Sequence, residues 1–165
     1  MGISDLGDDA ELRFRLITGA TLPGSKAQGD AIFNNVAIEV KMASANTINQ
    51  VRAVKFIPLV IWSKESHDWF VLPAPDIVAL VSQKLRGQHT ENPFESATLS
   101  LSKLRSYRVN ENLLVEALHD AITRASEFED LRLLMSEILK KSKDLALESR
   151  AKVHAVIASN HEILA

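Results

Sequence analysis

Hydrophobic and polar positions follow a strand-like pattern in much of the first two thirds of the chain and a helical period in the last third. Two short apolar and β-branched runs, residues 30–33 and 36–42, are separated by Asn34-Asn35. A two-residue connection of this type predicts a β-hairpin. Further strands are predicted at residues 55–63, 69–72 and 96–101, the first of them weakened by Pro58.

Helical spacing of apolar residues marks the other segments. One helix is predicted at residues 8–19, with acidic side chains at its start and Gly19 at its end. A second helix is predicted at residues 77–85, and Gly87 follows it as a C-cap. From Asn110 onward, three apolar stripes predict helices to the end of the chain. This order predicts an α/β (α+β) fold, a small mixed central sheet flanked by helices with a helical C-terminal tail. We expect residues 1–108 to form the core, and residues 109–165 either to cover that core or to join two copies.

Composition narrows the classes of protein that fit this pattern. A chain of 165 residues is about the size of one domain, and it has no cysteine, which excludes disulfides, thiolate metal sites and cysteine nucleophiles. The N-terminus has neither the basic nor the apolar region of a secretion signal, and no apolar run is long enough to span a membrane. We therefore expect a cytoplasmic protein with no membrane partner.

Charge is distributed unevenly although the net charge is only −2. Residues 41–108 carry nine basic and five acidic side chains, whereas the segments before and after them are both net acidic. The middle segment is therefore the part that could attract phosphate groups. An asymmetry of this size also fits random scatter over a solvated surface.

The predicted hairpin brings ionisable side chains together. Counting outward from the Asn34-Asn35 turn places Asp30 opposite Glu39, with Cβ atoms ~5 Å apart, and strand alternation places Lys41 on the same face as Glu39. Opposed carboxylates repel, but a divalent cation between them removes the repulsion, and Mg²⁺ binds through one or two carboxylates plus water and phosphate oxygens. The alternative is a surface salt bridge between Lys41 and a carboxylate.

The spacing Gly29-Asp30, eight intervening residues, then Glu39-Val40-Lys41 resembles the motif of the PD-(D/E)xK nuclease superfamily, the fold of many restriction endonucleases. The resemblance covers residues 8 to about 101, with Gly29 in place of the motif's proline. It implies a restriction-endonuclease-like sheet and a DNA-cleaving site that uses Mg²⁺, with Mn²⁺ as a substitute. Asp30 and Glu39 would hold the metal, with the Val40 carbonyl as an extra ligand, and Lys41 would position or activate water.

Other candidate residues lie outside the motif. Glu11, on the first helix, is a further candidate metal ligand, or else it serves the helix dipole. Gln50 is a candidate near the scissile phosphate, or else part of a solvated turn. Basic and polar residues of the middle segment are candidate DNA contacts, each with an ordinary exposed loop as its alternative: Arg52, Lys55, Lys84, Arg86, Gln88, His89, Lys103 and Arg105.

The sequence therefore predicts a Mg²⁺-dependent endonuclease acting on double-stranded DNA, most plausibly a type II restriction enzyme. A homing or Holliday-junction-resolving nuclease of the same fold is the first alternative. A non-catalytic helical interaction protein, in which the tail carries the function, is the second. Because one active site cuts one strand, we expect a dimer or higher homo-oligomer.

Overall fold

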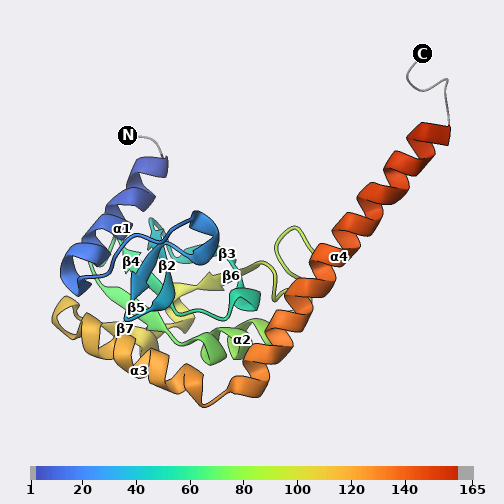
Figure 1. The fold of residues 1–165 in the computed structure, drawn as a ribbon. Coiled ribbons are helices and arrows are strands. Elements are labelled where there is room, and N and C mark those ends of the chain that lie inside the picture. Colours follow the sequence, from blue (N-terminus) through green and yellow to red (C-terminus); the bar gives the residue numbers. More distant parts are fainter. Residues whose placement is uncertain (1–2, 160–165) are drawn as a thin grey trace.

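The computed structural model describes residues 3–159 and shows a body of mixed α/β structure from which one long helix projects (Figure 1). The α-helices are α1 (Ile3–Thr18), α2 (Ala74–Ser82), α3 (Leu114–Ser126) and α4 (Glu129–Ser159). The strands are β1 (Ala31–Phe33), β2 (Val36–Ala43), β3 (Thr47–Val51), β4 (Leu59–Ser63), β5 (Trp69–Leu72), β6 (Ala97–Ser100) and β7 (Arg108–Val109). Short 3-10 helices are η1 (Lys26–Gln28), η2 (Ala53–Lys55), η3 (Leu101–Lys103), η4 (Arg105–Tyr107) and η5 (Glu111–Leu113).

The central sheet has five strands in the order β1-β2-β4-β5-β7. Its β2–β4 pair is parallel and its other pairs are antiparallel, so the predicted mixed α/β class is confirmed. Strands β3 and β6 form a separate antiparallel pair. Strand β3 belongs to the long crossover that parallel strands require, because β3 and η2 lie between β2 and β4 in the chain, whereas β6 follows α2.

Both faces of the central sheet are covered. One face packs against α1 and α3, through residues such as Phe14 and Leu118. The other packs against α2, the β3–β6 pair and the first part of α4, where Met135 is 1% exposed. Strands β4 and β5 are therefore buried along their whole length, as expected for strands between two layers.

The predicted hairpin and its register are confirmed for β1. Ala31 pairs with Ile38 and Phe33 with Val36, and both turn residues adopt positive φ angles, 48° for Asn34 and 64° for Asn35. These angles are those of a type I′ turn, which asparagine tolerates better than most residues.

The predicted pairing of Asp30 with Glu39 is wrong, because the β1–β2 ladder stops at Ala31. The Asp30 amide donates to the Ile38 carbonyl at 2.9 Å. The preceding residue, Gly29, has φ of 122°, and a Cβ added there would lie 3.1 Å from the Ile38 carbonyl oxygen. A side chain at this position would be strained and crowded, which is the local reason for glycine before Asp30.

Several predicted boundaries are also corrected. The strand predicted from residue 55 begins at Leu59, because residues 53–55 form η2 instead. The helix predicted at 77–85 begins at Ala74 and ends at Ser82, before Gly87. The first helix begins at Ile3, although residue 8 was its predicted start. The division predicted between residues 108 and 109 falls inside β7, which pairs with β5.

One part of the C-terminal segment packs against the body, and the other part projects from it (Figure 1). Helix α3 and the first turns of α4 contribute to the two cores, whereas the rest of α4 runs away from the body (Figure 1). On this distal part, Val153 and Val156 are 56% and 57% exposed. Within residues 3–159, no helix combines the length and apolar character needed to cross a membrane.

Candidate active site

Strand β2 carries Glu39 and Lys41 on one face and buried Ile38 and Val40 on the other. This alternation follows from the two-residue period of a strand. Ile38 and Val40 join the core beneath α1 and α3, whereas Glu39 and Lys41 point to the side of α2 and η2. The Glu39 amide donates to the Pro58 carbonyl at 3.0 Å, which fixes Glu39 at the start of the β2–β4 pairing.

Asp30 reaches the same end of β2 from outside the ladder. Its Oδ2 accepts the Val40 amide at 2.8 Å. The N–H and C=O of a strand residue point towards the same neighbouring strand, so the Val40 carbonyl also points to the Asp30 side, beyond the last β1–β2 pair. The carboxylate of Asp30 and the carbonyl of Val40 are therefore directed into one region.

The charged groups of the site act on one another. Burial raises the pKa of the Asp30 carboxyl above its ordinary value, and the negative charge of Glu39 raises it further. The hydrogen bond from Val40 and the positive charges of Lys55 and Lys41 oppose this increase in the pKa of Asp30. Glu39 and the two lysines thus lie close enough to Asp30 to form one electrostatic cluster.

Lys55 is the closest cation to Glu39. Its Nζ lies 3.1 Å from Glu39 Oε2, whereas Nζ of Lys41 lies 4.0 Å from Glu39 Oε1. The sequence predicts Lys55 as a DNA contact, but the structure places it beside the motif residues. No spacing rule indicates this position, because Lys55 arrives through the β3–η2 crossover rather than along β2.

The space within the cluster is small. The pocket beside Glu39, Lys41 and Lys55, which Asp30 does not line, has a volume of about 10 Å³, close to the minimum for one water molecule. Apolar side chains of Ile57, Leu59 and Ile77 close its far side. A pocket of this volume is too small to admit a nucleotide.

The donor set fits Mg²⁺ held by few protein ligands. Asp30 and Glu39 supply two mutually repelling carboxylates and Val40 supplies a carbonyl, which are the hard oxygen ligands that Mg²⁺ prefers, with water and phosphate completing the shell. Among the residues that the structure describes, no three Asp, Glu or His side chains gather into a metal-binding group. Glu11 on α1 therefore does not complete a three-acid set with Asp30 and Glu39.

Gln50 and Gln88 are joined to each other, and their described contacts do not include the acidic pair. The Gln50 amide donates to Gln88 Oε1 at 2.9 Å, and Thr98 Oγ1 lies 3.3 Å from the same oxygen. Gln50 has φ of 56° at an irregular point of the β3–β6 pairing. The side chain of Gln88 therefore ties the loop between α2 and β6 to β3, and its Oε1 already accepts hydrogen bonds within the protein.

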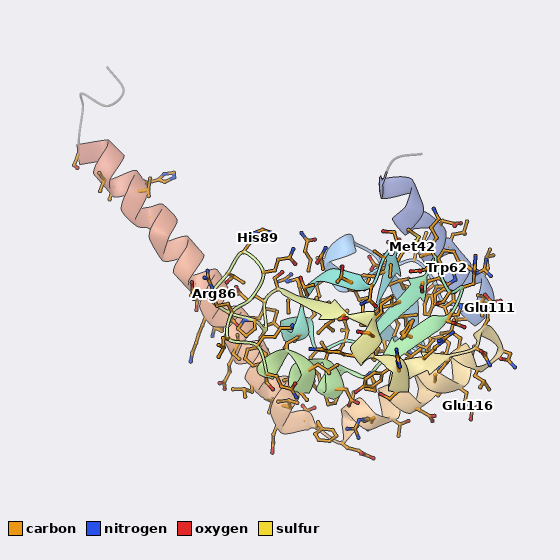
Figure 2. All side chains as sticks on the ribbon, turned by 180° about the vertical axis from the view of Figure 1, so that it is seen from behind. Met42, Trp62, Arg86, His89, Glu111 and Glu116 are labelled. Carbon is orange, nitrogen blue, oxygen red and sulfur yellow. The ribbon has the colours of Figure 1, made fainter. Side chains whose placement is uncertain are left out.

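The remaining candidate DNA contacts are exposed and occupy several positions. Lys84, Arg86 and His89 lie on the loop between α2 and β6, and Figure 2 shows Arg86 and His89 on the α4 side of the body, far from Glu111 and Glu116. Lys84 and Lys103 line one pocket beside β3 and β6. Arg105 lines a different pocket, with Arg108 among its neighbours. Arg52 borders the small pocket of Glu39, and its Nε donates to the Glu95 carbonyl at 3.3 Å.

No protein-family model and no curated protein sequence matches this chain.

Proposed function

We propose that this protein is a Mg²⁺-dependent endonuclease of the restriction-endonuclease-like class that hydrolyses phosphodiester bonds in double-stranded DNA. The observation that carries the proposal is the cluster at the end of β2. There the Asp30 carboxylate is held by the Val40 amide and lies within electrostatic range of Glu39, Lys41 and Lys55. The residues of the D-x8-E-x-K motif therefore form one group, although Asp30 lies outside the ladder.

Each residue has a defined role in this mechanism. Asp30 and Glu39, with the Val40 carbonyl, would hold the magnesium ion. When bound, such an ion would supply charge stabilisation to the phosphoryl group and lower the pKa of an attacking water. Lys41, next to Glu39 on the same face, orients that water or takes its proton. The narrow pocket beside Glu39 is too small for a nucleotide, so in this proposal the reaction takes place at the surface, where a duplex can reach it.

DNA as the substrate is supported by the positions of the basic residues. Lys84 and Lys103 approach one pocket from two segments that are distant in sequence. The loop that carries Lys84 also carries Arg86 and His89, and Gln88 ties it to β3 near the site. Positive side chains on a loop tied down in this way suit binding to a phosphate backbone.

A type II restriction enzyme is the form we propose, working as a homodimer or larger assembly. A homing or junction-resolving nuclease would use the same chemistry on a different substrate. The exposed distal part of α4 is our candidate contact between copies, and sedimentation of the wild-type protein reports directly whether it self-associates.

The deciding experiment is cleavage of DNA with matched lysine variants. Wild type, Lys41→Met and Lys64→Met are incubated with supercoiled plasmid, a library of linear duplexes and a four-way junction, in Mg²⁺ or in EDTA. We expect wild type to cut only with Mg²⁺ and Lys41→Met to be about 100-fold slower or worse, as for loss of one catalytic donor. Lys64 lies exposed in the β4–β5 turn, so Lys64→Met should match wild type.

The substrate that is cut separates the candidates. Cleavage of linear duplex at one sequence supports restriction or homing, and selective cleavage of the junction supports a resolvase. If wild type cuts none of the three substrates, the nuclease proposal fails and the helical interaction protein becomes the better description.

A further inference from the structure

Lys55 lies beside Glu39, one of the two carboxylates that we propose as metal ligands. The Nζ of Lys55 donates to Glu39 Oε2 at 3.1 Å, and the two side chains are only 22% and 21% exposed. Lys41, the lysine of the motif, is farther from the same carboxylate, at 4.0 Å. Of these two lysines, Lys55 is thus the closer partner of Glu39.

The backbone that carries Lys55 is fixed although its side chain is long. Its neighbour Val54 is buried, and the Val54 amide donates to the Phe94 carbonyl at 3.0 Å. Phe56, on the other side, ends η2 in the left-handed conformation with φ of 49°, and its amide donates to Ala53. The four-carbon stem of lysine can therefore change direction while its Cα stays in place.

The charges of the cluster balance only without a metal. Asp30 and Glu39 carry two negative charges, and Lys41 and Lys55 carry two positive charges. A bound Mg²⁺ adds two positive charges, which weakens the attraction of Glu39 for an ammonium group and leaves the site attractive to a phosphodiester. Lys55 already lies in the site, and its flexible stem allows its ammonium to turn from Glu39 towards that phosphate.

We propose that Lys55 is a second catalytic lysine of this site: its ammonium neutralises Glu39 while the metal is absent, and contacts the scissile phosphate once Mg²⁺ and DNA are bound. This inference rests on the proposed nuclease function. The inference adds to that function a residue outside the D-x8-E-x-K motif, Lys55, with a role in both metal affinity and phosphate binding. Arg52 is a poorer candidate, since it is exposed and bonded to the Glu95 carbonyl.

The test separates metal binding from cleavage. Calorimetric titration with Mg²⁺ and Mn²⁺ in the absence of DNA is performed on wild type, Lys55→Met, Lys55→Arg and the control Lys64→Met. Removing the ammonium takes away one positive charge that neutralises the two carboxylates. We therefore expect Lys55→Met to bind either metal about tenfold more tightly than wild type. Lys55→Arg keeps the charge and should remain within about twofold of wild type, which is a difference well below 1 kcal/mol.

Cleavage is then measured in single turnover at saturating metal and DNA. We expect Lys55→Met to be about 100-fold slower than wild type despite its tighter metal binding, because a donor to the phosphate is lost. Unchanged or weaker metal binding by Lys55→Met overturns the inference, and so does cleavage at the wild-type rate. Far-UV circular dichroism and thermal melting establish that each variant is folded.

The two proposals fail in different ways. A wild-type protein that neither binds metal nor cuts DNA contradicts the nuclease proposal and, with it, the role of Lys55. A wild-type protein that does both, beside a Lys55→Met variant indistinguishable from it, contradicts only the role of Lys55.

Discussion

The ion pair between Glu39 and Lys55 should couple their contributions to stability in the metal-free protein. At the observed 3.1 Å, Coulomb's law gives about 1 kcal/mol in bulk water and about 5 kcal/mol at an effective dielectric constant of ~20. The side chains are partly exposed, at 22% and 21%, and ordering a lysine opposes the attraction. We therefore expect a coupling energy of about 1–2 kcal/mol, between the values for an exposed pair and a buried one.

A double-mutant cycle measures this coupling. Urea unfolding of wild type, Glu39→Gln, Lys55→Met and the double variant is followed in EDTA at neutral pH, at low and high salt. The matched control is the cycle on Arg86 and Glu91, which are 3.3 Å apart but 73% and 86% exposed, and which should couple by about 0–0.5 kcal/mol. A Glu39–Lys55 coupling no larger than that of the control would refute the claim that Lys55 is the main counter-charge of Glu39.

Three further predictions concern the site, the tail and the turn. The pKa of Asp30 is raised, so the folded state favours its protonated form, and its ionisation costs stability as the pH rises through the folded pKa. Asp30→Asn should therefore melt above wild type at pH 7 while losing activity, and the difference in melting temperature should disappear below the ordinary pKa of 3.8. An equal or lower melting temperature of Asp30→Asn at pH 7 contradicts this. Met135→Ala should lower the free energy of unfolding by about 2–4 kcal/mol, because the Met135 side chain is only 1% exposed. The control Leu134→Ala should lower it by about 1 kcal/mol or less, because Leu134 is 48% exposed. Equal losses of stability in urea unfolding would contradict the packing of α4 against the body. Asn35→Val should cost about 1–2 kcal/mol by the same assay, because φ of 64° is strained for a β-branched residue, and an unchanged stability would argue against the type I′ turn.

Local signals were sufficient to predict the hairpin. The Asn34-Asn35 turn depends on the backbone preferences of two residues, and the pairing of Phe33 with Val36 follows from the length of the turn. The predicted helical periods near α1, α2 and α3 identified real helices, because each of these helices buries one side against a sheet face. Their ends were less predictable, as in α2, where Pro75 lies within the first turn.

Features that depend on tertiary contacts were not predictable in the same way. Strand β3, Thr47–Val51, is short and mostly polar, and it becomes a strand because β6 pairs with it. The position of Lys55 depends on the path of the crossover between β2 and β4, which no residue near Lys55 encodes. Strand β7, Arg108–Val109, has only two residues, and it is a strand because it pairs with β5.

The error in the predicted pairing of Asp30 explains how the site is formed. A ladder that continued to a pair between residues 30 and 39 would have placed the two carboxylates side by side on one face. Their repulsion disfavours that arrangement. Instead, Gly29 brings the chain close to the Ile38 carbonyl and the ladder stops at Ala31. The Val40 amide then donates to the Asp30 side chain at 2.8 Å, where a continued ladder would have used backbone groups of β1. Ending the ladder early therefore places the Asp30 carboxylate beside the Val40 carbonyl at one edge of β2, the arrangement that our proposal assigns to cation binding.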